Sequence, residues 1–170
     1  MVARNIDLVY GGGNIGLMGR IADEVMQRGG KVVGVIPKAL LDREVGHHGL
    51  TRLHVVDDMH QRKAMMADLS DGFIAMPGGW GTLEELFEML TWLQLGFHSK
   101  PIGLLNANGF YDKLLDFMSH QVSEGFLSAV QATLIMQDTV AESLIARMVA
   151  TPEASPPDPL PRHVAQDLLR

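Results

Sequence analysis

Short apolar runs alternate along this chain with longer segments of helical periodicity, and this alternation constrains the fold more than any other feature. A short apolar run bounded by Gly or Pro is typical of a buried strand, and an amphipathic segment after it is typical of the helix in a βαβ unit. The pattern predicts an α/β fold with a parallel sheet. The expected strands are 6–10, 31–36, 53–56, 72–76 and 102–106, with a weaker sixth at 134–136.

The segments between these runs predict the helices. After the first run, apolar residues recur at steps of three and four, which predicts a helix that stops near Gly29. Asp58 precedes Gln61 by three positions, the spacing of an N-cap, so it marks the start of the second helix. A third helix is expected to begin at Thr82. Two more are expected over about 110–122 and 140–149.

Proline marks the end of the regular region. Five of the eight prolines in this chain of 170 residues lie between positions 152 and 161, where proline prevents a continuous ladder or helix. We therefore expect one domain over 1–150 and a proline-rich tail over 151–170, with one helical turn at most near 164–169.

The composition excludes several functional classes. Because the chain has no cysteine, it has no thiol nucleophile, iron–sulfur cluster or thiolate zinc site. The seven histidines form no H-E-x-x-H pattern, so no metal site is expected. A net charge of −6 without a basic cluster argues against nucleic-acid binding. No apolar run reaches the roughly 18 residues of a membrane span, and the start has no secretory pattern, so we expect a soluble, cytoplasmic protein.

A first glycine turn follows the first expected strand. Gly11, Gly13 and Gly16, with Gly12 between them, satisfy G-x-G-x-x-G, so backbone N–H groups can approach an anion at the start of the next helix. A dinucleotide site also needs an acidic residue at the end of the next strand, and residues 35–38 (VIPK) provide none, which disfavours NAD. The alternative is that these glycines only permit a tight turn.

A second glycine loop follows the fourth expected strand and opens a helix. It comprises residues 77–82, with Gly78, Gly79, Trp80, Gly81 and Thr82 after the proline. Main-chain donors and the positive end of a helix dipole should meet there, at the carboxyl edge of the sheet. Two such turns on one edge indicate a ligand that carries phosphate.

Glu85 allows two interpretations. Thr82 and Glu85 have the spacing of a capping box, in which the glutamate only completes the start of a helix. Alternatively, a carboxylate beside a phosphate-binding loop lies where a sugar carbon would be, and it can stabilise positive charge or activate water.

Arg62 and Lys63 are the candidate cations of the second expected helix. Arg62 follows Met59 by three positions and precedes Met66 by four, which places it along a semi-apolar stripe. A guanidinium there could hold a phosphate or carboxylate bidentately, or it could extend along the surface and pair with an acid. Lys63 allows the same two interpretations, with simple solvation favoured.

The helix expected after Thr82 is apolar around too much of its circumference for one buried stripe. One face can pack on the sheet. We expect the other, with Met89 and Trp92, to pack against a second subunit, the alternative being a helix buried on both sides within one chain.

Three motifs together resemble the LONELY GUY family of cytokinin-activating enzymes. They are residues 11–19 (GGGNIGLMG), 59–63 (MHQRK) and 77–85 (PGGWGTLEE), and the likeness continues through 91–96 (TWLQLG) and 100–106 (KPIGLLN). It covers nearly everything up to about residue 149.

The resemblance implies a phosphoribohydrolase that cleaves the N-glycosidic bond of N6-substituted adenosine 5'-monophosphates and releases the base and ribose 5-phosphate. It implies a Rossmann-like, doubly wound parallel sheet with helices on both faces, formed by 1–150, and a homodimer with sites at the subunit interface. Family members were long labelled lysine decarboxylases, but none of the five lysines has the context of a pyridoxal Schiff base, and no cofactor is expected.

Carried onto this chain, the family's catalytic pair falls on Arg62 and Glu85. The loop from Gly78 to Thr82 would cradle phosphate and ribose. Other positions at which the family contacts its ligand are Glu44, Lys63, Glu84 and Thr91.

One departure from the family affects the sheet. Members usually begin with an extra strand and helix, and this chain starts where their second strand does. The missing strand is central in the doubly wound order, so we expect two sheet halves without their shared neighbour. A non-catalytic nucleotide or cofactor carrier and an inactive paralogue stay open as alternatives, although Arg62 together with Glu85 favours catalysis.

Overall fold

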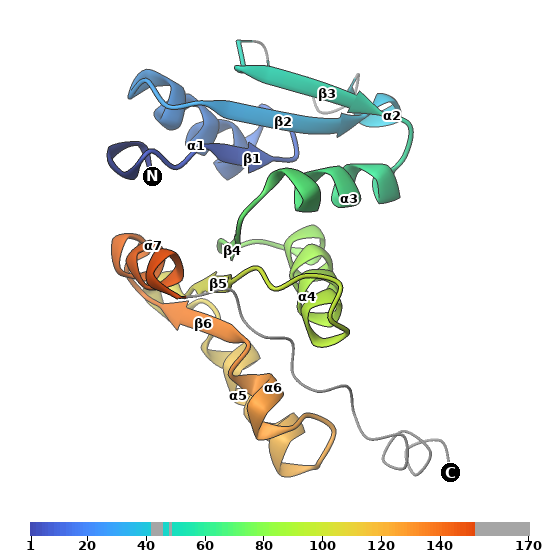
Figure 1. The fold of residues 1–170 in the computed structure, drawn as a ribbon, viewed down its shortest axis with the longest axis vertical. Helices are drawn as coiled ribbons and strands as arrows, with labels where there is room; N and C mark the ends of the chain where they lie inside the picture. Colours follow the sequence, from blue (N-terminus) through green and yellow to red (C-terminus); the bar gives the residue numbers. More distant parts are fainter. Residues whose placement is uncertain (42–45, 48, 152–170) are drawn as a thin grey trace. The chain divides into compact units, whose positions relative to one another are not determined.

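The computed structural model describes residues 1–41, 46–47 and 49–151. The chain divides into two compact units, Met1–Asp71 and Gly72–Arg170, and each contains a parallel sheet of three strands (Figure 1). The expected tail, including its helical turn, lies outside the described residues apart from Thr151.

The first unit has the sheet order β1-β2-β3. Its elements are η1 (Val2–Arg4), β1 (Leu8–Tyr10), α1 (Gly16–Gln27), β2 (Val32–Pro37), α2 (Lys38–Leu41), β3 (Arg52–Val56) and α3 (Met59–Leu69). Helix α1 packs on β1 and β2, and α3 contacts all three strands. The apolar faces of α1 and the sheet meet in a buried cluster of Tyr10, Ala22, Val25 and Val32.

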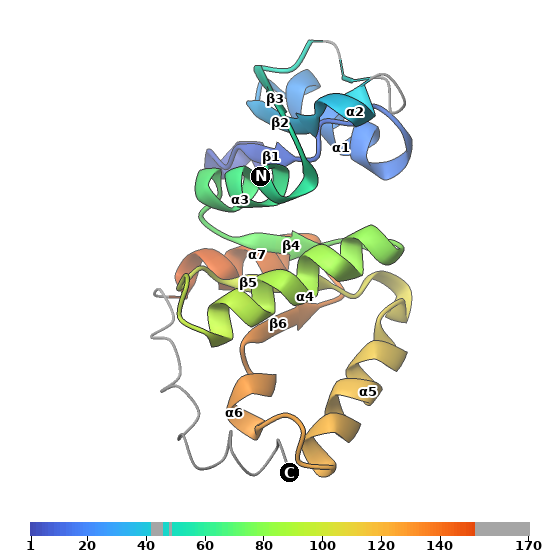
Figure 2. The same ribbon diagram turned by 90° about the vertical axis from the view of Figure 1, so that its right-hand side faces the viewer.

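The second unit has the sheet order β4-β5-β6. Its elements are β4 (Phe73–Ala75), α4 (Trp80–Gln94), β5 (Ile102–Leu105), η2 (Ala107–Gly109), α5 (Asp112–Ser123), α6 (Ala129–Ala132), β6 (Ile135–Asp138) and α7 (Ala141–Ala150). Helices α4 and α7 lie on opposite faces of this sheet (Figure 2).

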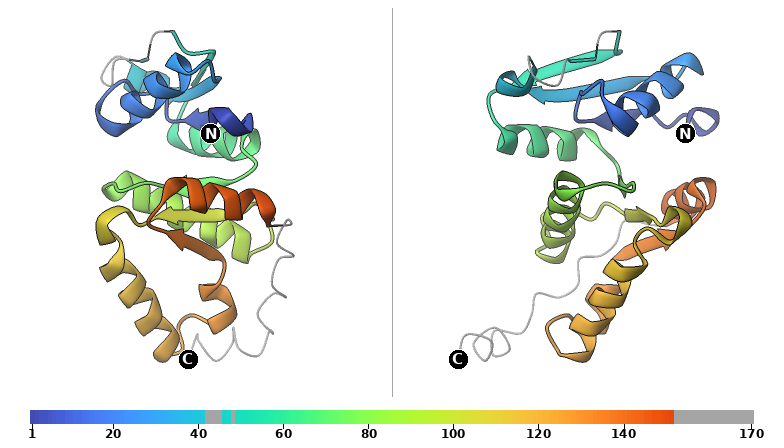
Figure 3. Two further views of the ribbon diagram at one scale, coloured as in Figure 1. Left: turned by 90° about the vertical axis from the view of Figure 1, so that its left-hand side faces the viewer. Right: turned by 180° about the vertical axis from the view of Figure 1, so that it is seen from behind.

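Helix α7 is held closely against the second sheet. It lies along β5 and β6 (Figure 3). A Cβ placed on Gly103 of β5 would come within 2.6 Å of Met148 Sδ and 3.2 Å of Leu144 Cδ1, so the helix touches the strand backbone itself. A side chain at position 103 would separate the two layers.

The six expected strands are all present, and all pair in parallel, which confirms the α/β class. The expectation of two sheet halves is also confirmed. Among the described residues, β1 pairs only with β2 and β4 pairs only with β5, so each sheet ends at one of these strands.

Two expectations about α4 are wrong. The helix begins at Trp80 rather than Thr82, with Gly79 as its N-cap. Met89, expected on an outward face, is buried, because it shares the three- and four-residue spacing of Leu86 and Leu93 on the inner face. Trp92 is half-buried.

None of the helices in the described ranges combines the length and the apolar character that crossing a bilayer requires.

Candidate functional site

In the first unit, Arg62 lies directly against the glycine turn that follows β1. A Cβ placed on Gly11 would fall 1.8 Å from Arg62 Nη2 and 2.9 Å from its Cζ. A side chain at position 11 would therefore displace the guanidinium, which lies directly on the Gly11 backbone. The two features that the sequence singled out in this half of the chain therefore meet.

The local structure of α3 explains how Arg62 reaches this place. Asp58 Oδ1 accepts a hydrogen bond from the Gln61 N–H at 2.8 Å, which confirms Asp58 as the N-cap. Gln61 Oε1 in turn accepts from the Asp57 N–H at 3.1 Å. Both ends of the first turn are thus fixed, and Arg62 and Lys63 project from a helix whose start is well defined.

Arg62 and Lys63 are both buried. The interpretation of Arg62 as an arginine that extends along the surface is therefore wrong, and so is simple solvation of Lys63. Burial of a cation costs free energy unless hydrogen bonds or opposite charge compensate for it. Arg62 Nη1 also lies 3.6 Å from Met59 Sδ, within the same helix.

The rest of the glycine turn at 11–16 is held by backbone contacts. Gly12 has a φ of 76°, and its carbonyl accepts from the His47 N–H at 3.0 Å. Gly13 forms an isolated antiparallel bridge with Gly46. His47, which the sequence presented only as a poor metal ligand, is buried with Nε2 3.0 Å from Asp23 Oδ1, so it supports the turn.

Gly16 is the first residue of α1 and has a φ of 67°. The N-cap of this helix, Ile15, makes no side-chain capping bond. Within the described residues, the turn from Gly11 to Gly16 therefore leads into a helix start that no N-cap side chain satisfies.

In the second unit, the glycine loop opens α4 without a side-chain cap. The N-cap Gly79 has φ −96° and ψ −150°, an extended conformation, and has no side chain to accept from the first turn. Trp80 is 90% exposed and Gly81 is also exposed. The first N–H groups of a helix have no intrahelical partner, so this end of α4 offers donors and a positive dipole to an anion.

Thr82 closes the loop instead of capping the helix. A Cβ placed on Gly78 would lie 2.2 Å from Thr82 Oγ1, so the threonine side chain packs on the Gly78 backbone. Because α4 starts at Trp80, the capping-box interpretation of Thr82 and Glu85 is wrong. Glu85 belongs to the second turn of α4 and is half-buried, while Glu84 is exposed.

Thr91 lies further along α4 and is exposed, with Oγ1 donating to the Phe87 carbonyl at 2.7 Å. Its hydroxyl proton is therefore used within the helix, and its oxygen stays able to accept. Glu44, the remaining position implied by the family, lies outside the described residues.

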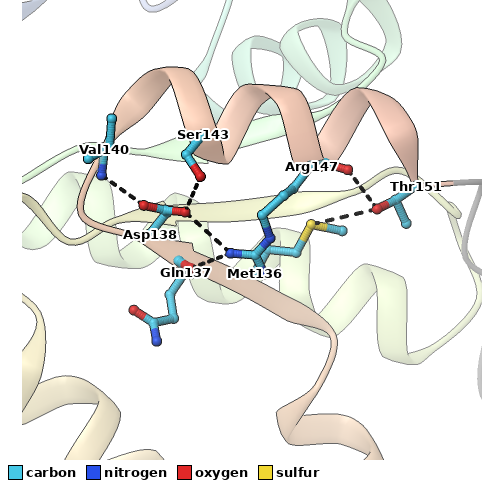
Figure 4. A network of polar contacts seen from close by, with 7 residues as sticks. All are labelled: Met136, Gln137, Asp138, Val140, Ser143, Arg147 and Thr151. Atoms are coloured by element: carbon cyan, nitrogen blue, oxygen red, sulfur yellow. Dashed lines mark hydrogen bonds and ion pairs between the residues drawn. The ribbon is translucent and has the colours of Figure 1, made fainter.

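The carboxyl edge of the second sheet carries polar residues that the sequence did not single out. Asp138, at the end of β6, accepts from the Val140 N–H at 2.9 Å and from Ser143 Oγ at 2.6 Å (Figure 4). The Ser143 hydrogen bond, followed by that of Val140, lowers the pKa of Asp138 from its usual value. Arg147 Nη1 lies 3.5 Å from the same carboxylate and donates to the Gln137 carbonyl at 2.9 Å.

These contacts fix the start of α7 to the end of β6. Asp138 also accepts, through its main-chain carbonyl, from the Asn106 N–H at 2.8 Å. Hydrogen bonds therefore join the end of β6 both to the start of α7 and to Asn106, which follows β5.

In the described part of the chain, no group of three or more His, Asp or Glu side chains is arranged to hold a metal ion.

Known proteins match this chain over most of its length. A profile of the family described as "Possible lysine decarboxylase" matches residues 18–148. The cytokinin riboside 5'-monophosphate phosphoribohydrolase LOG1 of Arabidopsis thaliana is 50% identical over 163 residues, which are 96% of this chain and 73% of that protein. The chain belongs to this family. The LONELY GUY resemblance of the glycine motifs is thereby confirmed.

Two further relatives of the LONELY GUY family have the same degree of likeness. The cytokinin riboside 5'-monophosphate phosphoribohydrolase LOG3 of Arabidopsis thaliana is 51% identical over 148 residues, 87% of this chain and 69% of that protein. The probable cytokinin riboside 5'-monophosphate phosphoribohydrolase LOGL3 of Oryza sativa subsp. japonica is also 51% identical, over 87% of this chain and 70% of its own length.

Proposed function

We propose that this LONELY GUY family chain hydrolyses the N-glycosidic bond of N6-substituted adenosine 5'-monophosphates and releases the free base and ribose 5-phosphate. The observation that carries the proposal is the identity of about 50% to proteins named as cytokinin riboside 5'-monophosphate phosphoribohydrolases, over 87% or more of the chain. The uncapped start of α4 supports it, because a helix N-terminus after a glycine loop binds phosphate well.

Within this proposal, Gly78 to Thr82 hold the 5'-phosphate and ribose. Glu85 stabilises the oxocarbenium-like ribose and helps to position water. Arg62 holds the substrate and favours departure of the purine. The half-burial of Glu85 and the burial of Arg62 support these roles, since electrostatic groups act most strongly where water is excluded.

Lys63, Glu84, Thr91 and Glu44 are proposed as further substrate contacts, and Gly11, Gly12, Gly13 and Gly16 as the turn that Arg62 rests on. The reaction needs no cofactor or metal in this scheme. We also propose a homodimer with sites at the subunit interface, which the exposed apolar side chains of Trp80 and Phe87 on α4 support. A cytoplasmic location stays a prediction.

Glu85→Gln tests the chemistry. It keeps the size of the side chain and removes its charge, so we expect the rate of base release to fall by on the order of 100-fold or more. The protein is incubated with AMP and with isopentenyl-AMP, and free base and ribose 5-phosphate are quantified by chromatography.

The matched control is Glu142→Gln, an exposed glutamate of α7. It should release base at the wild-type rate, and both variants should keep the wild-type melting temperature to within a few degrees. A Glu85→Gln variant with near-normal turnover would refute the assignment of Glu85. A wild-type protein that binds nucleotide without releasing base would identify a carrier instead of an enzyme.

A further inference from the structure

The loop at 77–82 has an anchor on its entry side that none of the site residues above supplies. Strand β4 ends its ladder at Ala75, which pairs with Leu104, so the carbonyl of the next residue, Met76, lies beyond the strand pairing. Tyr111 Oη donates a hydrogen bond to this carbonyl at 2.5 Å. Two residues separated by 35 positions are thereby joined at the edge of the sheet.

This contact determines where the loop leaves the sheet. Pro77 follows Met76, and proline both lacks an N–H and restricts the preceding residue to extended backbone. The direction of the chain at Met76 therefore sets the direction in which Gly78 and Gly79 depart. At the other end, Thr82 already packs on Gly78, so the hydroxyl of Tyr111 and the side chain of Thr82 hold opposite ends of the loop.

Tyr111 is itself held firmly. It is 2% exposed, and its ring meets that of Phe110 edge-on at a centroid distance of 4.8 Å. Its N–H donates to Asn106 Oδ1 at 2.7 Å, and Asn106 Nδ2 donates to Asp112 Oδ1 at 2.8 Å. Burial raises the pKa of the Tyr111 hydroxyl, which keeps its proton available for donation.

The turn between β5 and α5 is shaped for this arrangement. Asn108 and Gly109 both have left-handed backbone, with φ of 53° and 71°. A Cβ on Gly109 would lie 2.5 Å from Asp112 Oδ2, so the turn closes tightly on the carboxylate that holds Asn106. Asn106 is 4% exposed, and both the oxygen and the nitrogen of its buried side-chain amide have a hydrogen-bond partner.

We infer that Tyr111, held by Asn106, is a positioning residue for phosphate binding: it sets the conformation of the loop at 77–82 through the Met76 carbonyl. The inference rests on the proposed function, because it takes the 5'-phosphate of a nucleotide as the ligand of that loop. Neither Tyr111 nor Asn106 touches the ligand in this scheme.

Tyr111→Phe removes only the hydroxyl. Loss of one neutral hydrogen bond of this kind corresponds to about a 5-fold change in binding. We expect the Kd for AMP, measured by calorimetry on the full chain, to rise about 5-fold. In hydrolysis, KM should rise by the same factor while kcat stays within about twofold, because phosphate binding contributes equally to the ground and transition states.

Two comparisons separate positioning from a general loss of structure. Adenosine, which lacks the phosphate, should bind Tyr111→Phe and the wild type equally. Tyr10→Phe is the matched control, because the Tyr10 hydroxyl is buried without a hydrogen-bond partner among the described residues. It should leave the Kd for AMP unchanged. Asn106→Ser, a second variant, should weaken AMP binding in the same selective way.

The outcomes distinguish this inference from the proposed function. If the wild type releases base and Tyr111→Phe binds AMP as tightly as Tyr10→Phe does, the inference is wrong and the proposed function stands. Equal loss of adenosine and AMP affinity would also overturn it. If the wild type binds AMP without hydrolysing it and Tyr111→Phe still weakens AMP selectively, the inference stands and the proposed function fails. A wild type that binds no AMP contradicts both.

Discussion

At the scale of single residues, the contact between Arg62 and Gly11 is the closest fit in the candidate site. A buried guanidinium is stable only where the groups around it compensate for its lost hydration. Arg62 is buried, and the backbone of the glycine turn lies directly against its guanidinium. The sequence indicated both residues, one as part of a phosphate-type turn and one as an inward-facing cation. It could not indicate their contact, because nothing local in the sequence links position 11 to position 62.

Gly11→Ala tests the closeness of this fit. The new methyl group would fall on Arg62 Nη2, so we expect a loss of about 1–3 kcal/mol in the free energy of unfolding, the usual cost of overpacking. Urea denaturation measures it. Base release should fall at least about tenfold, because the guanidinium must move.

The control is a double-mutant cycle. In an Arg62→Ala background there is no guanidinium to displace, so the further cost of Gly11→Ala should shrink to a few tenths of a kcal/mol. Equal costs in the two backgrounds would show that the glycine serves the backbone and not Arg62.

The burial of Lys63 could not be predicted from the sequence around it. Simple solvation was the favoured interpretation of this lysine, yet its side chain is buried. Burial of a single long side chain is set by tertiary packing and not by helical periodicity. Tyr111 was missed for the same reason, since its partner Met76 is 35 positions away.

At the scale of elements, the start of α4 lacks a stabilising side-chain cap, and the same feature leaves its backbone N–H groups free to bind an anion. A helix that begins on Gly79 forgoes the stabilisation that a serine or aspartate cap supplies, and its donors stay available for a ligand. The capping-box pattern of Thr82 and Glu85 predicted a later start, but the extended backbone at Gly79 already allows the helix to begin at Trp80.

Gly79→Asp should lower the affinity for AMP and raise the free energy of unfolding. A Cβ at position 79 meets nothing within 4 Å and the backbone there is extended, so the side chain fits. The new carboxylate would cap α4 and face its dipole, and we expect a gain of about 0.5 kcal/mol in the free energy of unfolding. The same carboxylate occupies the anion site, so AMP affinity should fall at least about tenfold in calorimetry.

Gly79→Asn separates the cap from the charge. It should stabilise the helix to a similar degree and weaken AMP less than Gly79→Asp does. If Gly79→Asp leaves AMP affinity unchanged, the N-terminus of α4 is not where the phosphate binds.

Most elements were predictable because strand and helix periodicity is strong in this chain. The six strands are short apolar runs, and the helices α1, α3, α5 and α7 lie where they were expected. The one-turn helices α2 and α6 were missed, because four residues are too few to display a helical period. Met89 was misplaced because α4 is apolar on several sides and periodicity alone did not identify its inner face.

At the scale of the whole molecule, the two parallel sheets carry one glycine loop each, both at the carboxyl end of a strand that ends its sheet. That is where α/β proteins place ligands. The sequence predicted the parallel strands, the two glycine loops and the division into two sheet halves. The function rests on family membership, and phosphate binding by these loops is a proposal.

In the proposed function, a 5'-phosphate held at the start of α4 places the N-glycosidic bond for cleavage. The most direct measurement is the ratio of kcat/KM for isopentenyl-AMP to that for the same nucleoside without phosphate. Because kcat/KM includes the binding free energy that the phosphate supplies and the nucleoside lacks, we predict a ratio of at least about 1,000. Equal cleavage of the nucleoside and its monophosphate, or release of inorganic phosphate in place of the base, would contradict the account.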